Sequence, residues 1–561
     1  MDANKNEQAN SLEMAPFVKR KRLEPDEVNF SNHCLRNLSL YFSQYCDSTS
    51  IHGIKYVGQR GRYLLEKLLW LVIVIGVFTI CSILIHKTYR KWQTSPVIVT
   101  FSTTEKPISD IPFPAVTICP EAKFNPEIFN FTDILLKRIL NESISEEECC
   151  LVRFQWFAIV CSTYRIQKTS IKLGNYSNFL STADVIRFQA LPPLDPHHMT
   201  TIKWLGKELP ILDEVSLTFT SEGICYTFNM LPYDEVLRDA DDYVTQSAKT
   251  QKRTRKWSLD EGYPPGDYLG SYPRRTFLSG LEGGLVIDAL HTNHSHLDYI
   301  CDESLQGFKV VLHHPCELPN MEKHFRLPLD EALFVGIKPK MITISEDLIG
   351  YKPEDRKCYF GNEKFLSLYK YYTQENCLSE CLANYTLQQC GCLAFYMPTT
   401  TSTETCGLGS IECVKNSKIN YLENETYSEV GHGRCNCLPS CTSLSYDVET
   451  SQTRWDWRKA FEVLHRAGLS EFLPDEKGSH YSRIHVYYKD LQFLSSERNE
   501  LYGYVDFFSN VGGLLGLFIG LSVTSCIEIL YFLTLRLVCN IRKYGRHVWS
   551  GEPDLINSKD E

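Results

Sequence analysis

The sequence predicts an α+β membrane protein in which two transmembrane helices flank a large, disulfide-rich domain of mixed α and β structure. Two apolar segments, Leu68–Ile85 and Gly512–Phe532, are each long enough to cross a hydrocarbon core of ~30 Å. Of the 22 cysteines, 17 lie between these segments, from Cys119 to Cys441. The composition, with 43% hydrophobic and 22% charged residues, is that of a folded protein.

The first apolar segment predicts a transmembrane helix over residues 64–86. Leu68–Ile85 carries no charge, and the 63 residues before the predicted helix are mostly polar, whereas a signal peptide would begin near residue 1. Trp70, Trp92 and Tyr89 are the residue types found at membrane interfaces. Within residues 1–63, the basic run Lys19–Arg22 fits a cytosolic tail better than a nuclear signal in a protein with two spans.

The second apolar segment, within a predicted span over residues 506–538, has the composition of a pore lining. Four glycines allow close approach of backbones, and hydroxyl groups follow them. A carboxylate among membrane residues costs several kcal/mol unless it faces protein or water. The small and ionisable residues are Gly512, Gly513, Gly516, Gly520, Ser522, Thr524, Ser525 and Glu528.

Two spans place both termini on one side of the membrane and residues 87–505 on the other, with a tail over residues 539–561. The cysteine density of the large loop is typical of an oxidising compartment. Basic residues flank both ends of the first span and do not decide the orientation. We therefore expect cytosolic termini and a multi-pass protein of the plasma membrane, with the lipid bilayer as a partner. The loop carries glycosylation sequons at Asn130, Asn141, Asn175, Asn293, Asn384 and Asn424.

Patterns in the loop predict a mixed α and β domain. Strands are indicated for residues 113–120 and 485–491, a strand–turn–strand for 215–229, a strand for 307–319, and helices within 363–396 and 455–472. Lys252–Lys256 is a basic cluster that fits either a solvated loop or a processing or polyanion site. The net charge of −10 argues against a nucleic-acid partner.

The cysteine cluster over residues 377–441 is the most specific local pattern. It contains the pairs Cys390-x-Cys392 and Cys435-x-Cys437. Zinc sites favour a gap of about two to four residues between cysteines, so stacked disulfides are the better interpretation and zinc the alternative. Such bridges would staple helices into a stiff lever.

Catalytic interpretations of the sequence fail. Gly520-Leu521-Ser522 resembles the start of a nucleophile elbow, but Thr524 replaces the second glycine that the elbow needs. His313-His314 has no second cluster at metal-ligand spacing. We expect no enzyme activity, no metal site and no cofactor, only a permeant ion.

Five motifs now carry a resemblance to a known family. They are Ser50-Ile51-His52-Gly53, Phe113–Cys119, Gly223–Asn229, the cysteine cluster, and Gly516–Glu528. In this order, which is the family order, they resemble the degenerin/epithelial sodium channel superfamily, most closely its insect pickpocket branch. The resemblance implies a palm, thumb, finger, knuckle and β-ball arrangement of the ectodomain. It also implies a trimeric, amiloride-sensitive, sodium-selective channel assembled with two identical or homologous subunits.

The resemblance assigns roles to individual residues. Gly520, Leu521 and Ser522 match the selectivity filter, and His52 and Gly53 match a cytosolic gating motif beneath it. Ser509 matches the degenerin position at the gate, and Gly516 matches an amiloride contact. Gly512, Gly513 and Glu528 complete the predicted pore. The resemblance leaves the stimulus open, and an extracellular ligand, acid or mechanical force would each fit.

The resemblance also implies six disulfides. They are Cys119–Cys225, Cys358–Cys441, Cys377–Cys437, Cys381–Cys435, Cys390–Cys413 and Cys392–Cys406. Cys149, Cys150, Cys161, Cys301 and Cys316 remain without an assigned partner, and their number is odd. The run Tyr351–Lys357 lacks the tryptophan that couples thumb to membrane in acid-sensing members, which removes one reason to expect gating by acid. A two-span adhesion or signalling receptor and an ectoenzyme are the rival hypotheses.

Overall fold

The structure is a computed structural model of the 561-residue chain. It describes residues 27–94, 97–123, 129–143, 151–161, 176–180, 199–239, 257–259, 261–264, 271–297, 300–301, 305–399, 403–426, 435–469, 478–553 and 555. The chain divides into two compact units. The helical unit comprises residues 1–96 and 501–561, and the sheet unit comprises residues 97–500.

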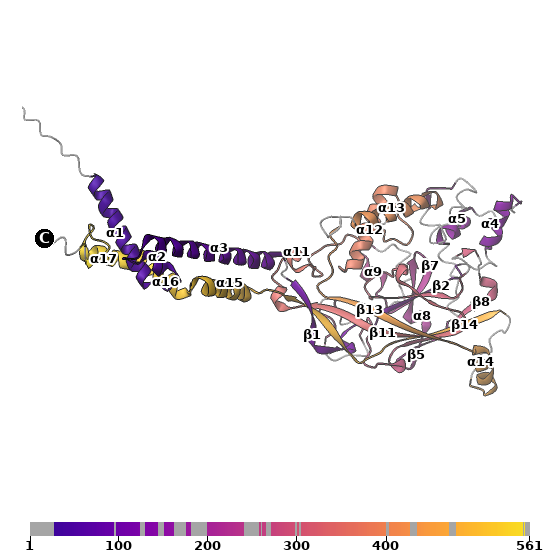
Figure 1. The fold of residues 1–561 in the computed structure, drawn as a ribbon. Helices are drawn as coiled ribbons and strands as arrows, with labels where there is room; N and C mark the ends of the chain where they lie inside the picture. The colour runs from indigo at the N-terminus through magenta and orange to yellow at the C-terminus, as the bar shows by residue number, and fades with distance from the viewer. Residues whose placement is uncertain are drawn as a thin grey trace, which may run out of the picture. The chain divides into compact units, whose positions relative to one another are not determined.

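Helices make up the helical unit. The N-terminal part contributes α1 (Glu27–Ser48), α2 (Ile54–Gly58) and α3 (Leu64–Thr94). The C-terminal part contributes α15 (Tyr504–Ile519), α16 (Val523–Tyr531), the π-helix η9 (Phe532–Arg536) and α17 (Leu537–Tyr544). Figure 1 shows α15 running beside α3, the helix with which it makes contact.

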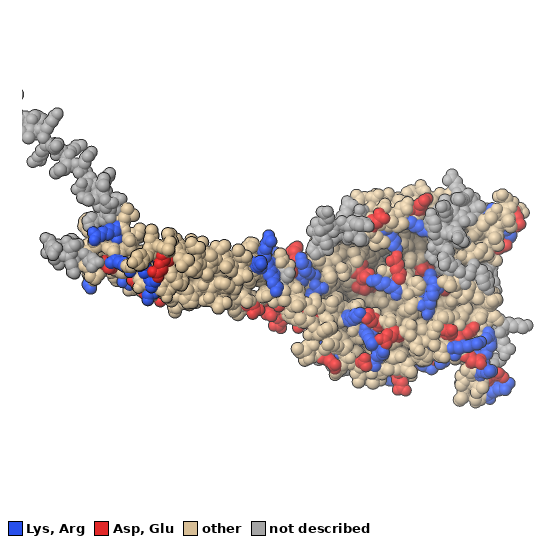
Figure 2. All heavy atoms as spheres, in the orientation of Figure 1, with Lys and Arg blue, Asp and Glu red and all other residues tan. Residues whose placement is uncertain are grey.

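Two helical stretches in the described residues have the length and hydropathy to cross a membrane, Leu64–Thr94 and Val523–Tyr544. Tyr504–Ile519 is a shorter apolar helix before the second of them. Figure 2 shows an uncharged surface along these helices, with acidic and basic side chains at its ends. The second predicted span is therefore not one continuous helix, because residues 520–522 interrupt it.

An eight-stranded sheet forms the centre of the sheet unit, in the order β1-β15-β11-β14-β8-β4-β5 with β13 also paired to β11. Its strands are β1 (Val97–Pro107), β4 (Met199–Trp204), β5 (Lys207–Leu209), β8 (Leu285–Asn293), β11 (Glu331–Ile344), β13 (Ser443–Arg454), β14 (Ser479–Tyr488) and β15 (Gln492–Glu500). The antiparallel β1–β15 pair joins the first and last strands of the unit, with Val97 opposite Glu500.

A second sheet of five strands has the order β10-β9-β2-β7-β6. It contains β2 (Ala115–Pro120), β6 (Val215–Thr220), β7 (Gly223–Phe228), β9 (Phe308–His313) and β10 (Phe325–Leu327). The two sheets share one apolar core, in which Phe113 packs edge-on against both Trp204 and Tyr488. This burial of aromatic area holds the two sheets together. A small third sheet pairs β3 (Phe179–Leu180) with β12 (Thr405–Cys406).

Helices surround the sheets (Figure 1). They are α4 (Phe131–Leu140), α5 (Leu151–Val160), α8 (Ile211–Glu214), α9 (Tyr233–Val236), α11 (Pro353–Arg356), α12 (Gln374–Cys390), α13 (Ile411–Thr426) and α14 (Trp457–Arg466). The strands predicted near residues 113–120, 215–229, 307–319 and 485–491 are present, as is the helix within 455–472. Within the range 363–396, where helices were predicted, α12 begins after the cap residue Thr373, whose side chain accepts from the Asn376 amide.

Seven disulfides join described cysteines, all within the sheet unit. The six pairs that the family resemblance implies are each present, and Cys161–Cys301 is a seventh. Cys377–Cys437 and Cys381–Cys435 tie α12 to the segment after α13, and Cys390–Cys413 ties α12 to α13 itself. Cys316 is buried and unpaired, whereas Cys149 and Cys150 lie outside the described residues. No group of three or more metal-ligating side chains occurs among the described residues.

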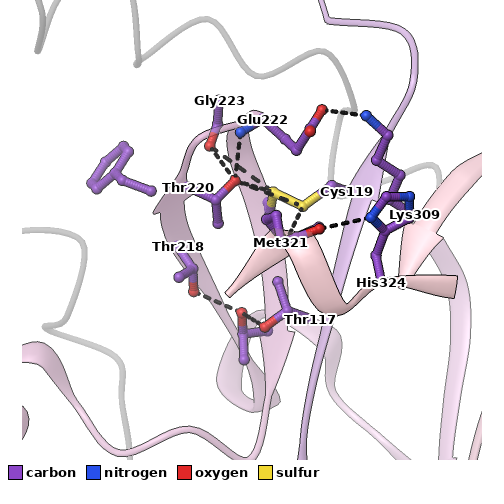
Figure 3. The surroundings of a disulfide bond; sticks show 12 residues. Thr117, Cys119, Thr218, Thr220, Glu222, Gly223, Lys309, Met321 and His324 are labelled. Carbon is purple, nitrogen blue, oxygen red and sulfur yellow. Dashed lines mark hydrogen bonds and ion pairs between the residues drawn. A yellow bond between two sulfur atoms is a disulfide. The ribbon is translucent and has the colours of Figure 1, made fainter. Parts of the chain in front are cut away.

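Figure 3 shows the surroundings of Cys119–Cys225, which bridges β2 and β7. Thr220 Oγ1 lies 3.0 Å from Cys225 Sγ. Beside the disulfide, Glu222 pairs with Lys309 at 2.7 Å and with Lys123 at 2.6 Å. These charges are almost fully buried, so each pair offsets the cost of removing its members from water.

Candidate functional site

The predicted filter residues occupy a break between two helices. Gly520 has φ 73° and ends α15 in the left-handed conformation, which glycine adopts without a steric penalty. The Gly520 amide donates to the Gly516 carbonyl at 3.0 Å, and the Leu521 amide donates to the Leu515 carbonyl at 3.2 Å. These bonds close the end of α15, a pattern common at glycine-terminated helices.

Ser522 begins the next helix. Its Oγ accepts a hydrogen bond from the Ser525 amide at 3.2 Å, and Ser525 Oγ accepts from the Ser522 amide at 3.1 Å. This reciprocal capping box starts α16. Gly520-Leu521-Ser522 is therefore a short non-helical connection fixed at both ends. Within a membrane, such backbone is tolerated only where protein buries it or where it borders water.

The His-Gly motif lies directly against this break. The His52 amide donates to the Ile519 carbonyl at 2.8 Å, which satisfies a carbonyl in the last turn of α15. A β-carbon built on Gly520 would come within 2.9 Å of the His52 imidazole. Gly53 has φ 80°, and its own β-carbon would come within 2.7 Å of Val74 on α3. The His-Gly motif therefore fits between α3 and the break because residues 53 and 520 are glycines.

Hydroxyl groups extend this contact to α16. Ser50 Oγ lies 2.6 Å from Ser525 Oγ and donates to Glu528 Oε2 at 3.4 Å. Ser525 is 1% exposed, so its pairing with Ser50 replaces contacts with water. The pore role of Glu528 stays a prediction, and the partnership of Ser50 and Ser525 was not predicted, since single serines far apart in sequence carry no periodic signal.

An apolar cluster supports the same contact. Ile51, Cys81 and Ile519 are buried together, and Trp70 stacks on Tyr56 with ring centroids 4.5 Å apart. A small cavity of about 90 Å³ lies between His52, Gly53, α3 and the end of α15. The N-terminal segment is thus packed into the helical unit rather than left in solvent.

One face of α15 consists of small residues. Ser509, Gly512, Gly513 and Gly516 recur at intervals of three or four positions, which places them on one side of the helix. All four are exposed, and a β-carbon on any of these glycines would meet no atom within 4 Å. Leu514, Leu515 and Phe518 instead join the cluster that packs on α3.

The remaining predicted residues lie in the sheet unit. Asn130 and Asn141 are exposed at the two ends of α4, Asn384 is exposed on α12, and Asn293 is half-buried and caps a short turn at Ser295. Asn424 lies within α13. Asn175 and Lys252–Lys256 fall outside the described residues.

His313 and His314 are buried at the end of β9. His313 Nε2 lies 2.8 Å from Thr117 Oγ1, and His314 Nδ1 lies 2.9 Å from Cys316 Sγ. Burial lowers the pKa of His313 to about 4 and that of His314 to about 3, so both imidazoles are neutral at pH 7. These contacts make the pair part of the protein interior.

The run Tyr351–Lys357, which contains α11, contacts the last strand of the sheet unit. Tyr351 Oη donates to the Glu500 carboxylate, and Arg498 Nη1 donates to the Lys357 carbonyl at 2.9 Å. Arg356, 1% exposed, donates to the Tyr351 carbonyl at 2.7 Å. The run that lacks the expected tryptophan is therefore still joined to β15, through polar groups.

Comparison with known proteins identifies the class of protein as an ion channel. The family model described as "Amiloride-sensitive sodium channel" matches residues 45–532. The chain belongs to this family, which consists of ion channels and not enzymes.

The chain is similar over most of its length to proteins of insects and mammals. It is 27% identical to Pickpocket protein 28 of Drosophila melanogaster, over 89% of this chain and 79% of the relative. It is 22% identical to the sodium channel protein Nach of Drosophila ananassae, over 94% of both chains. It is 23% identical to the human bile acid-sensitive ion channel, over 87% of this chain and 84% of the relative. These similarities confirm the resemblance to pickpocket-like members of the superfamily.

Proposed function

We propose that this chain is a subunit of a trimeric, sodium-selective, amiloride-sensitive cation channel of the plasma membrane. A stimulus received by the extracellular domain opens the pore, and sodium then enters passively and depolarises the cell. Family membership supports the channel class. The helical unit supplies the physical argument for a trimeric, sodium-selective pore.

The helix break at Gly520-Leu521-Ser522 carries the proposal. A filter replaces the hydration shell of an ion with oxygen atoms held at fixed positions. The break supplies the carbonyls of Gly520 and Leu521, which lie between the two helices. Ser522 adds a hydroxyl, whereas its carbonyl accepts from the Cys526 amide of α16. His52 and Gly53 support it from the N-terminal segment. One such break per chain does not surround an ion, so the pore requires symmetry-related copies.

The exposed small-residue face of α15 fits the same assembly. Ser509, Gly512, Gly513 and Gly516 would allow three copies of α15 to approach closely around an axis. Ser509 is then the gate position and Gly516 the amiloride contact. Glu528 would face the aqueous path below the filter, where a carboxylate is tolerated.

The distribution of thiols supports the orientation. Every disulfide among described residues lies in the sheet unit, and all free described cysteines except Cys316 lie in the helical unit. Disulfides persist in the extracellular space and thiols in the cytosol. We therefore assign residues 87–505 to the outside and both termini to the cytosol.

The connection from stimulus to pore runs through β15. Glu500 and Arg498 contact the run Tyr351–Lys357, and β15 is followed in sequence by α15. Movement of the disulfide-linked helices α12 and α13 would therefore be transmitted to the start of the second span.

Current recorded from cells that express the chain tests the function. We expect a current that amiloride blocks and a reversal potential that follows the sodium gradient. Cell-surface biotinylation and the mass of the purified assembly serve as controls for delivery and for trimer formation. A surface-delivered trimer that conducts neither alone nor with a homologous subunit would favour the receptor hypothesis.

A further inference from the structure

The segment after α17 folds back onto the N-terminal helix α1. Asn37 Nδ2 donates to the His547 carbonyl at 2.9 Å, and Asn37 Oδ1 accepts from Ser550 Oγ at 2.8 Å and from the Ser550 amide at 3.3 Å. Asn37 is 1% exposed and Ser550 is 0% exposed. Asn540 of α17 donates to the Ser550 carbonyl at 3.1 Å. We call residues 547–553, docked on α1, the C-terminal clasp.

Further contacts strengthen the clasp. Trp549 packs edge-on against Tyr41 with ring centroids 5.5 Å apart. Glu552 pairs with Arg60 at 3.1 Å and accepts a hydrogen bond from Gln44. Buried amide and hydroxyl groups are costly without partners, so the Asn37–Ser550 contact is specific rather than incidental.

The His-Gly segment follows the C-terminal end of the same helix α1. Ser43 Oγ donates to the Gly58 carbonyl at 3.0 Å. Cys46 is 0% exposed, and a β-carbon on Gly58 would come within 2.4 Å of its Sγ. Because α1 and α2 are packed this closely, displacement of α1 must move the Thr49–Gly53 connection between them. That connection contains His52, which bonds the Ile519 carbonyl next to the helix break.

A second path joins α1 to the helix below the break. Tyr41 Oη donates to the Phe532 carbonyl at 2.5 Å, and Tyr45 packs edge-on against the Phe532 ring. Phe532 begins the π-helix η9, an irregular turn of a kind frequent at functional sites. The clasp therefore fixes α1 beside two elements that flank the break. One is the His-Gly segment, which bonds the Ile519 carbonyl before the break, and the other is η9, which follows α16 after the break.

We propose that the C-terminal clasp is a cytosolic control element of the channel. Docked on α1, it holds the His-Gly segment against Gly520 and keeps the filter selective for sodium. When the clasp is released, α1 loosens, the support of the filter weakens, and the sodium-to-potassium permeability ratio falls. This role rests on the proposed function for the filter, whereas the docking of the clasp on α1 does not.

Thiol labelling tests the docking without any need for current. In membranes that contain the full-length chain, N-ethylmaleimide labelling is followed by mass spectrometry at buried Cys46 and at exposed Cys34, both on α1. We expect slow labelling of Cys46 in the wild type. In Asn37→Ala or Ser550→Ala, loss of the buried hydrogen bonds should raise the Cys46 rate about fivefold or more. Ser48→Ala is the matched control, because Ser48 Oγ is exposed and bonds carbonyls of α1 itself.

A chain that ends at Gly545 provides a second variant, which removes the clasp without introducing an altered side chain. It should label at Cys46 at least as fast as Asn37→Ala, because it removes every contact of the clasp. Equal Cys46 rates in the wild type, Ser550→Ala and the shortened chain would overturn the proposal, whether or not the chain conducts.

Permeability measurements test the control of the filter. We expect Asn37→Ala to lower the sodium-to-potassium permeability ratio more than Ser550→Ala, because it removes the bonds to the His547 carbonyl and from the Ser550 amide as well as the bond from the Ser550 hydroxyl. The double variant should match Asn37→Ala, because the described partner of the Ser550 hydroxyl on α1 is Asn37. Ser48→Ala should keep the wild-type ratio. Fast Cys46 labelling with an unchanged ratio would overturn the control role. A wild-type chain that passes no current would contradict the proposed function and with it the filter role, whereas the labelling would still decide the docking.

Discussion

The imidazole of His52 lies against the α-carbon of Gly520, although 467 residues separate them in the sequence. Any side chain at residue 520 would begin 2.9 Å from that ring. The break in the second span and the N-terminal motif are thus one structural element, and neither is complete without the other.

Replacement of Gly520 by alanine is expected to abolish sodium selectivity. The β-carbon would clash with His52, and φ 73° costs a non-glycine residue about 1–2 kcal/mol. Reversal potentials in sodium and potassium measure the effect. Gly76→Ala on α3 is the control, because a β-carbon there meets no atom within 4 Å. Wild-type selectivity in Gly520→Ala would show that the contact with His52 is dispensable.

A bulky residue at position 522 is expected to abolish the current or to remove its selectivity for sodium. Ser522→Tyr places a ring in the predicted filter and removes the cap of α16, which is worth about 0.5–2 kcal/mol. Ser522→Thr keeps a hydroxyl for the cap and should retain more selectivity. Bi-ionic reversal potentials compare the two variants, and unchanged selectivity in Ser522→Tyr would reject the filter assignment.

A large side chain at Ser509 is expected to hold the pore open. Overpacking where three helices meet costs about 1–3 kcal/mol. If only the closed state bears this cost, the gating equilibrium shifts by about 5- to 150-fold. Constitutive amiloride-blocked current from Ser509→Val or Ser509→Phe is the measurement. A Ser509 variant at the surface of a conducting assembly without added current would contradict the gate.

Removal of a disulfide from the α12–α13 region should lower stability before it alters ion selectivity. By the loop-entropy relation, loss of Cys390–Cys413, with a separation of 23 residues, costs about 3.4 kcal/mol. Loss of Cys358–Cys441, with a separation of 83, costs about 4.5 kcal/mol. Double alanine variants test whether stability falls before ion selectivity changes. Thermal unfolding, surface expression and stimulus response are the measurements. Peptide mapping without reduction is the direct check, and free thiols or bound zinc at these cysteines would refute the stiff lever.

Glu317 is expected to give the sheet unit a stability that falls as pH rises. Burial raises the pKa of its carboxyl to about 7 from an ordinary value of 4.5. The folded state therefore holds a proton that the unfolded state releases, and stability declines between about pH 4.5 and 7. His313 and His314, with lowered pKa values, act in the opposite direction, and their cost grows as pH falls below 6.5. Glu317→Gln should remove only this contribution, so that stability rises more steeply between pH 4.5 and 7 in the variant than in the wild type. Thermal unfolding between pH 4.5 and 8 compares the two proteins, and parallel pH profiles would exclude Glu317 as a source of pH dependence.

The sequence predicted those features that rest on local chemistry. Apolar length identified both spans, and alternating strands such as β6 and β7 were correctly placed. The break at residues 520–522 was not predicted, because the second span was expected to be one continuous helix. The functional roles of the predicted filter and gate residues stay predictions. Contacts between distant polar residues were missed, because one asparagine and one serine, such as Asn37 and Ser550, form no repeating pattern. Cys161–Cys301 was left unassigned for a similar reason, since spacing alone does not determine pairing.

The pairing of β1 with β15 has a consequence for biosynthesis. Val97 meets its partner Glu500 only after roughly 400 further residues have been made, which takes about 20–80 seconds at 5–20 residues per second. Throughout that interval β1, with Phe101 75% exposed even in the finished fold, has no native partner on the ribosome-bound chain. Such an edge is prone to mispairing. A chain truncated before residue 492 would lack β15, the only described strand that pairs with β1, and would therefore leave β1 permanently without a native partner.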